Sequence, residues 1–160
     1  MAPLNPTITT SPATSVALSP DGVMLATGNA DGTVRLWDVA TAGQIAALTG
    51  PAGPVTSVAL SRDGKTLAAG NADGTVRLWD VATHRQITAL TGPGGAVNSL
   101  AFSPDGTTLA TGSADHTIRL WDVAYLVNVV PHLCASAKRT LTPAEWARYV
   151  PGLPYRKVCP

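Results

Sequence analysis

Apolar and polar residues alternate in short stretches along most of the chain, and one such stretch occurs three times. Residues 33–40 read Thr-Val-Arg-Leu-Trp-Asp-Val-Ala, residues 75–82 repeat them, and residues 117–124 differ only at Ile118. The tryptophans Trp37, Trp79 and Trp121 follow one another at a spacing of 42 residues (79 − 37 and 121 − 79). A fixed period near forty residues is typical of stacked copies of one supersecondary unit, none of which buries its apolar faces alone.

The alternation predicts short β-strands separated by turns in each copy. We expect the first strand at residues 14–18, 56–60 and 98–102, the second at 24–29, 66–71 and 108–113, and the third within 33–40, 75–82 and 117–124. Asp-Gly pairs such as Asp21-Gly22 mark the turns, because glycine supplies the positive φ that tight turns require. A fourth strand is expected at residues 44–49 and 86–91, whereas the third copy offers only residues 126–130, out of register.

The two ends of the chain differ from the repeats. Residues 1–13 contain three prolines and predict an extended lead-in, followed by repeats at about 14–54, 55–96 and 97–124. Residues 125–160 predict a short helical tail, in which Thr142, Pro143 and Glu145 form a helix start resembling a capping box.

Three in-register motifs resemble those of the WD-repeat family of β-propellers over about residues 13–124: Ser-Pro-Asp-Gly, Leu-Ala-Thr-Gly and Arg-Leu-Trp-Asp-Val. The resemblance implies an all-β fold of three four-stranded blades, which is an incomplete ring because such rings have at least four blades. It also implies a structural hydrogen-bond network in each blade, at Thr27, Asp31, Trp37, Asp73, Trp79, Thr111, Asp115 and Trp121. We expect that network to be truncated, because Ala69 replaces the hydroxyl in the second copy and Gly-Pro replaces the family's Gly-His.

The resemblance places partner contacts on the loop side next to the first strand and the turn aspartate. The matching positions are Thr14, Ala30, Pro54, Thr56, Ala72, Ala96, Asn98 and Ala114. These residues are small, whereas interaction hot spots are usually Trp, Tyr or Arg. Arg35, Arg77 and Arg119 recur in register, which is compatible with a basic row, but we interpret them as ordinary exposed strand residues. An open array would expose two apolar blade faces, so self-association that completes the propeller is also expected.

Composition and charge narrow the partner classes. Apolar residues make up 45% of the chain, and no stretch is apolar for the roughly 18 residues of a membrane helix. We see no signal peptide and expect a cytoplasmic protein. Residues 1–124 hold six Lys and Arg against nine Asp, while residues 125–160 hold five against one Glu. A basic tail docking on an acidic body explains this better than nucleic-acid or lipid binding, because the cations are scattered.

Candidate catalytic chemistry is sparse. The nine aspartates fit turns or follow Trp, and His84, His116 and His132 lie in different segments, so we expect no enzyme, cofactor or metal. Cys134 and Cys159 leave three interpretations open: independent thiols, a disulfide, or a metal site, the last with the least support.

These patterns predict a non-enzymatic scaffold that mediates protein–protein interaction, as part of a larger or oligomeric propeller. An alternative comes from residues 146–155, which resemble the closing segment of long bacterial WD-repeat proteins. It is a detached sensor or regulatory C-terminal segment of a larger ATPase-type or kinase-type signalling protein. Both predictions rest on family analogy, since fold alone does not determine function.

Overall fold

The computed structural model describes residue 8 and residues 11–50, 53–92 and 94–124, which form three antiparallel sheets. We call these sheets blades one, two and three. Blade one has the strand order β1-β2-β3-β4, with β1 Ala13–Leu18, β2 Met24–Asn29, β3 Thr33–Asp38 and β4 Gln44–Thr49. Blade two has β5 Val55–Leu60, β6 Thr66–Asn71, β7 Thr75–Asp80 and β8 Arg85–Thr91. Blade three has β9 Val97–Phe102, β10 Thr108–Ser113 and β11 Ile118–Asp122.

The all-β architecture is confirmed for the described residues, and the strands lie within two residues of their predicted positions. Blade three has three described strands, so β11 pairs with β10 alone among them. The predicted helical tail, residues 126–130, Cys134 and Cys159 lie outside the described residues.

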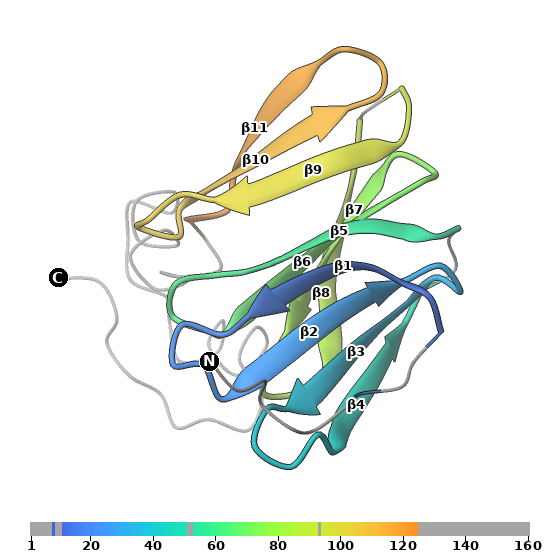
Figure 1. Cartoon of the computed structure of the whole chain (residues 1–160). Coiled ribbons are helices and arrows are strands. Elements are labelled where there is room, and N and C mark those ends of the chain that lie inside the picture. Colours follow the sequence, from blue (N-terminus) through green and yellow to red (C-terminus); the bar gives the residue numbers. More distant parts are fainter. Residues whose placement is uncertain (1–7, 9–10, 51–52, 93, 125–160) are drawn as a thin grey trace, which may run out of the picture.

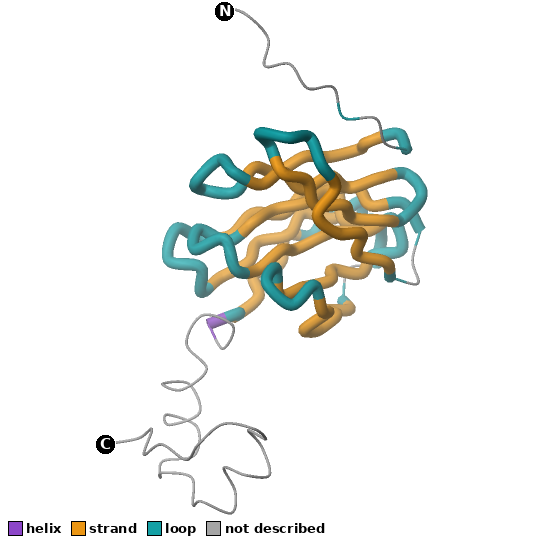
Figure 2. The backbone as a smooth tube through the Cα atoms, turned by 90° about the horizontal axis from the view of Figure 1, so that it is seen from below, coloured by secondary structure: helices purple, strands orange, loops and turns teal. Residues whose placement is uncertain are grey.

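The tight turns between strands contain residues with positive φ angles. Gly22 and Gly32 have φ angles of 73° and 81°, in the left-handed region that glycine adopts readily. His116 occupies the place of Gly32 in blade three and takes φ 65°, so the turn is kept without glycine. Figure 2 shows these turns and loops at the two ends of the strands.

The blades follow one another so that each packs its face on the next (Figure 1). Between blades one and two, Val34 and Leu36 of β3 lie in one buried cluster with Val55, Val58 and Leu67. Between blades two and three, the in-register residues Val76, Leu78, Val97, Leu100 and Leu109 form the second cluster. The core therefore lies between the blades, because each sheet is too thin to bury apolar side chains by itself.

Two glycines allow the blades to approach closely. A Cβ built on Gly28 of β2 would lie 2.5 Å from Val55 Cγ1, and one on Gly70 of β6 would lie 2.6 Å from Val97 Cγ1. Each glycine thus leaves a socket that the first valine of the next blade fills.

Hydrogen bonds join the same strands across the interface. The Thr14 hydroxyl lies 2.9 Å from Gly28 O within its own blade and also reaches Val55 O in blade two. Thr56 repeats this arrangement with Gly70 O and Val97 O. The Val58 amide donates back to Ser15 Oγ at 3.1 Å. The register of neighbouring blades is therefore fixed by these hydrogen bonds as well as by apolar packing.

The two ends of the array are open. Ile118 and Leu120 of β11 are 81% and 72% exposed, although the in-register Val34 and Leu36 are 1% and 0% exposed. At the other end, Val16 and Leu18 of β1 are 62% and 61% exposed. The same repeat positions are therefore buried between blades inside the array and exposed at its two ends.

Candidate partner-binding surface

The turn after the second strand and the segment entering the first strand lie together in every blade. The amides of Ala30, Ala72 and Ala114 donate to Pro12 O, Pro54 O and Ala96 O at 2.8–2.9 Å. The structure thereby brings the predicted partner-facing positions to one edge of each blade. Ala30, Pro54, Ala72, Asn98 and Ala114 are exposed there, whereas Thr56 and Ala96 are half-buried.

The threonines at the start of the first strand have a structural task at this edge. The Thr56 hydroxyl is engaged between Gly70 O and Val97 O, and the Thr14 hydroxyl is engaged in the same way one blade earlier. Partner contact at position 56 would therefore involve its methyl group and backbone rather than its hydroxyl.

The turn aspartates hold their own turns. Asp31 Oδ1 accepts the Thr33 amide at 2.9 Å and the Thr33 hydroxyl, while Oδ2 pairs with Arg35 at 2.9 Å. The hydroxyl and then the amide of Thr33 lower the pKa of Asp31 to about 2, so this carboxylate is charged at neutral pH. Asp73 accepts the amide and hydroxyl of Thr75 in the same manner, at 2.9 and 2.7 Å.

Asp115 has an additional task in blade three. Its Oδ2 accepts the amide of Gly94 at 2.7 Å, which ties the turn to the loop that enters β9. The Thr117 hydroxyl, followed by the Gly94 amide, holds the pKa of Asp115 well below its ordinary value. A backbone amide thus contacts the turn aspartate in the loop where the family resemblance places a histidine.

Two of the tryptophans placed in the predicted network donate to threonines, in a buried pair in blade one and a partly buried pair in blade three. Trp37 Nε1 donates to Thr27 Oγ1 at 3.0 Å, and Trp121 Nε1 donates to Thr111 Oγ1 at 3.0 Å. In blade two, Ala69 stands where the other two blades have the acceptor threonine, so Trp79 lacks that hydroxyl partner. The recorded hydrogen bonds of Asp31 and Asp115 go to turn, loop and neighbouring groups instead of to these pairs.

Replacing Thr27 with valine should lower the free energy of unfolding by about 1–3 kcal/mol, because it leaves the buried indole N–H of Trp37 without an acceptor. Urea unfolding of the two proteins measures the difference. Thr49→Val, at an exposed position of β4, is the matched control and should change stability little. Equal effects of the two substitutions would contradict a structural role for the Thr27–Trp37 pair.

Two buried asparagines were missed by sequence reasoning. Asn29 and Asn71 are 0% and 1% exposed, and their Nδ2 groups donate to Thr33 O and Thr75 O at 3.0 and 3.2 Å. In blade three Ser113 takes this place and donates to Gly95 O at 3.0 Å. The signal available in the sequence was an asparagine directly before each Ala-Asp-Gly-Thr turn.

The arginine row differs from the expected exposed strand residues. Arg77 is only 8% exposed, and a Cβ on Gly50 would lie 3.0 Å from its Cδ and Nε. Arg119 approaches Gly92 similarly, 3.2 Å from a Cβ there. The expectation was wrong for Arg77, because Gly50, which follows the last strand of blade one, lies against its side chain.

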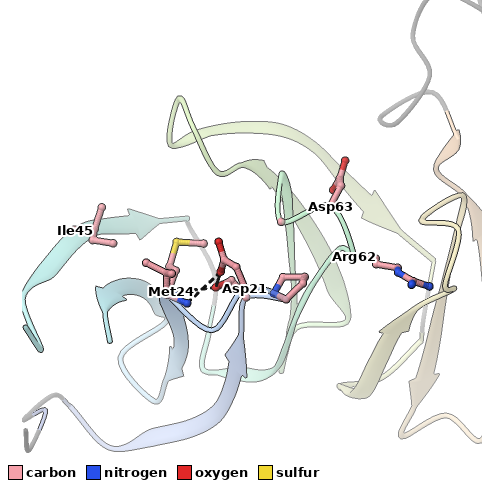
Figure 3. Close-up of a pocket in the computed structure, with 9 residues that line it drawn as sticks. Asp21, Met24, Ile45, Arg62 and Asp63 are labelled. Atoms are coloured by element: carbon pink, nitrogen blue, oxygen red, sulfur yellow. Dashed lines mark hydrogen bonds between the residues drawn. The ribbon is translucent and has the colours of Figure 1, made fainter. Parts of the chain in front are cut away.

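A groove of about 510 Å³ lies at the opposite ends of the strands, between the first turns of blades one and two. Figure 3 shows Asp21 beside Met24, with Ile45 on one side and Arg62 and Asp63 on the other. Asp21 accepts the Ser19 hydroxyl and the Val23 amide, and these bonds lower its pKa in that order. The Asp21 carboxylate of the groove therefore also stabilises its own turn.

Three segments of the chain, residues 5–38, 43–80 and 84–122, match the family described as WD domain, G-beta repeat, and together they span more than half of it. The chain belongs to the WD40 repeat family. The second matched segment contains β4 of blade one and β5, β6 and β7 of blade two, so one WD40 repeat bridges two blades. No curated protein matches the chain.

Members of the WD40 repeat family typically mediate protein–protein interaction. The described residues contain no group of three His, Cys, Asp or Glu side chains placed to hold a metal ion. They also contain no helix that is long and apolar enough to cross a membrane.

Proposed function

We propose that this WD40 chain is a non-enzymatic scaffold for protein–protein interaction, whose three blades form part of a larger or oligomeric propeller. One observation carries the proposal. Leu120 is 72% exposed, while Leu36 and Leu78, at the same position of the other blades, are 0% exposed. Exposing such an apolar face to water is unfavourable, so packing another blade against the β11 face would lower the free energy.

The blade edge that carries the predicted partner-facing positions supports a binding role without catalysis. Its aspartates are each held by two or more hydrogen bonds from their own turns or from a neighbouring loop. The aspartate carboxylates are thus engaged in stabilising the turns at this edge. Small side chains and backbone groups remain for a partner to contact.

A tandem chain tests the proposal. Residues 11–124 would be followed by residues 83–96, which supply a fourth strand in register, and then by residues 13–124. The junction then packs Leu120 and Ile118 of the first copy against Val16 and Leu18 of the second. We expect its melting temperature to exceed that of the single chain by about 10 °C in dilute solution, because several apolar side chains become buried.

The control is the same tandem chain with Leu120→Glu at the junction, which should lose most of the gain. Equal melting temperatures for the single and tandem chains would contradict an incomplete propeller.

The alternative function, a detached sensor segment of a larger ATPase-type or kinase-type protein, is suggested by residues 146–155. A neighbouring reading frame that encodes further WD40 repeats joined to an effector module would favour this alternative. If no such reading frame were found and the chain associated with itself, the scaffold function proposed above would be favoured instead.

A further inference from the structure

We propose that the blade covering each open face belongs to a second copy of this chain. The β11 face of one copy packs on the β1 face of its partner, and the partner's β11 face packs on the first copy's β1 face. The result is a closed ring of six blades made from two chains. This inference rests on the proposed function, because it names the partner that completes the propeller.

The interfaces inside the chain supply the template. Leu36 is covered in a cluster that contains Val58, and Leu78 is covered in one that contains Leu100. The next pair in this series is Leu120 and the residue at the position of Val58 in a following blade. In a second copy that residue is Val16, which is itself 62% exposed. The two open faces thus carry the two halves of an interface that the chain already forms twice.

Gly112 provides an independent sign of an unfilled contact. A Cβ at Gly28 or Gly70 would collide with the first valine of the next blade, at 2.5 and 2.6 Å. At Gly112, the third glycine of this series, nothing lies within 4 Å of the Cβ position. The socket is therefore open, and the residue that enters it from a second copy is Ala13, which stands in register with Val55 and Val97.

The polar contacts extend in the same way. Thr14 and Thr56 reach the carbonyl oxygens of Val55 and Val97 in the following blade. The third member of this series is Asn98, which is exposed. Its side-chain amide is a hydrogen-bond donor, so it suits the carbonyl oxygen of Ala13 in a second copy.

The number of blades sets the number of copies. When each chain contributes its three described blades, the blade count of the ring is a multiple of three, and propellers typically have four to eight blades. Six is the multiple that fits, so two chains close the ring. Under two-fold symmetry, the contact between Leu120 and Val16 then occurs twice, once at each junction.

The test compares Gly112→Val with Ala89→Val by sedimentation velocity of the full chain over a dilution series. We expect the unmodified chain to sediment with twice its mass of 16.4 kDa. Gly112→Val should raise the dissociation constant on the order of a hundredfold, because the added carbons block both junctions. Ala89→Val introduces the same side chain at an exposed position of β8 in the middle blade and should leave the dimer intact.

Leu120→Glu supplies a second variant and should also give monomers, with the β-sheet circular dichroism of the parent chain. A monomeric parent, a broad series of larger species, or dimers that persist in both Gly112→Val and Leu120→Glu would overturn the two-chain ring. The tandem chain separates the two levels of the account. A monomeric parent with a stabilised tandem chain would overturn the second copy as partner and leave the incomplete propeller standing.

Discussion

Replacing Leu78 with alanine should lower the free energy of unfolding by about 2–5 kcal/mol. Leu78 is 0% exposed and lies in the cluster between blades two and three, where the removed carbons leave a cavity. Both blades lose contacts at once, because the core lies between sheets rather than within one. Urea unfolding, followed by circular dichroism and tryptophan fluorescence, measures the change.

The matched control is Leu120→Ala, the same substitution one repeat later. Leu120 is 72% exposed in the single chain. In dilute solution, where copies are separate, its replacement should change stability by no more than about 0.5 kcal/mol. Equal costs at the two positions would mean that blade three is covered within one chain.

Gly70→Val should disrupt the contact between blades two and three. The Cβ position of Gly70 lies 2.6 Å from Val97 Cγ1, 2.9 Å from Val97 Cβ and 3.2 Å from Leu100 Cδ2. Valine would force the blades apart, at a cost of about 1–3 kcal/mol or more. We expect a lower urea midpoint together with faster amide exchange in β9 and β10.

Gly112→Val is the comparison for this change, because its Cβ meets nothing within 4 Å in the single chain. Its stability in dilute solution should equal or exceed that of the parent, since valine favours strands more than glycine does. If Gly70→Val were tolerated equally well, the close approach of the blades would be contradicted.

Sequence patterns predicted the strands because their causes are local. Alternating apolar residues, Asp-Gly turns and the spacing between Trp37, Trp79 and Trp121 depend only on neighbours along the chain. The expectation that an incomplete array exposes two apolar faces also followed from the repeat count. The sequence did not predict which residues lie on those faces. That depends on how neighbouring blades are aligned, and the pattern of a single repeat carries no information about this alignment.

The candidate surface was harder to predict because neighbouring blades decide it. Arg77 repeats the residue type of Arg35, yet Gly50 lies against its side chain and Arg77 is only 8% exposed. The Thr56 hydroxyl reaches a carbonyl oxygen that lies 41 residues further along the chain. The Trp–hydroxyl pairs were predicted from the family pattern, but the hydrogen bonds of the aspartates within the turns depend on backbone geometry.

Amide hydrogen exchange of the full chain, measured at several protein concentrations, tests the central claim most directly. If the open faces are covered by a second copy, exchange in β1 and β11 should slow as concentration rises. Exchange in β6 and β7, whose faces are already covered, should stay constant. Exchange in β1 and β11 that is independent of concentration would contradict the claim that these faces join one copy to another.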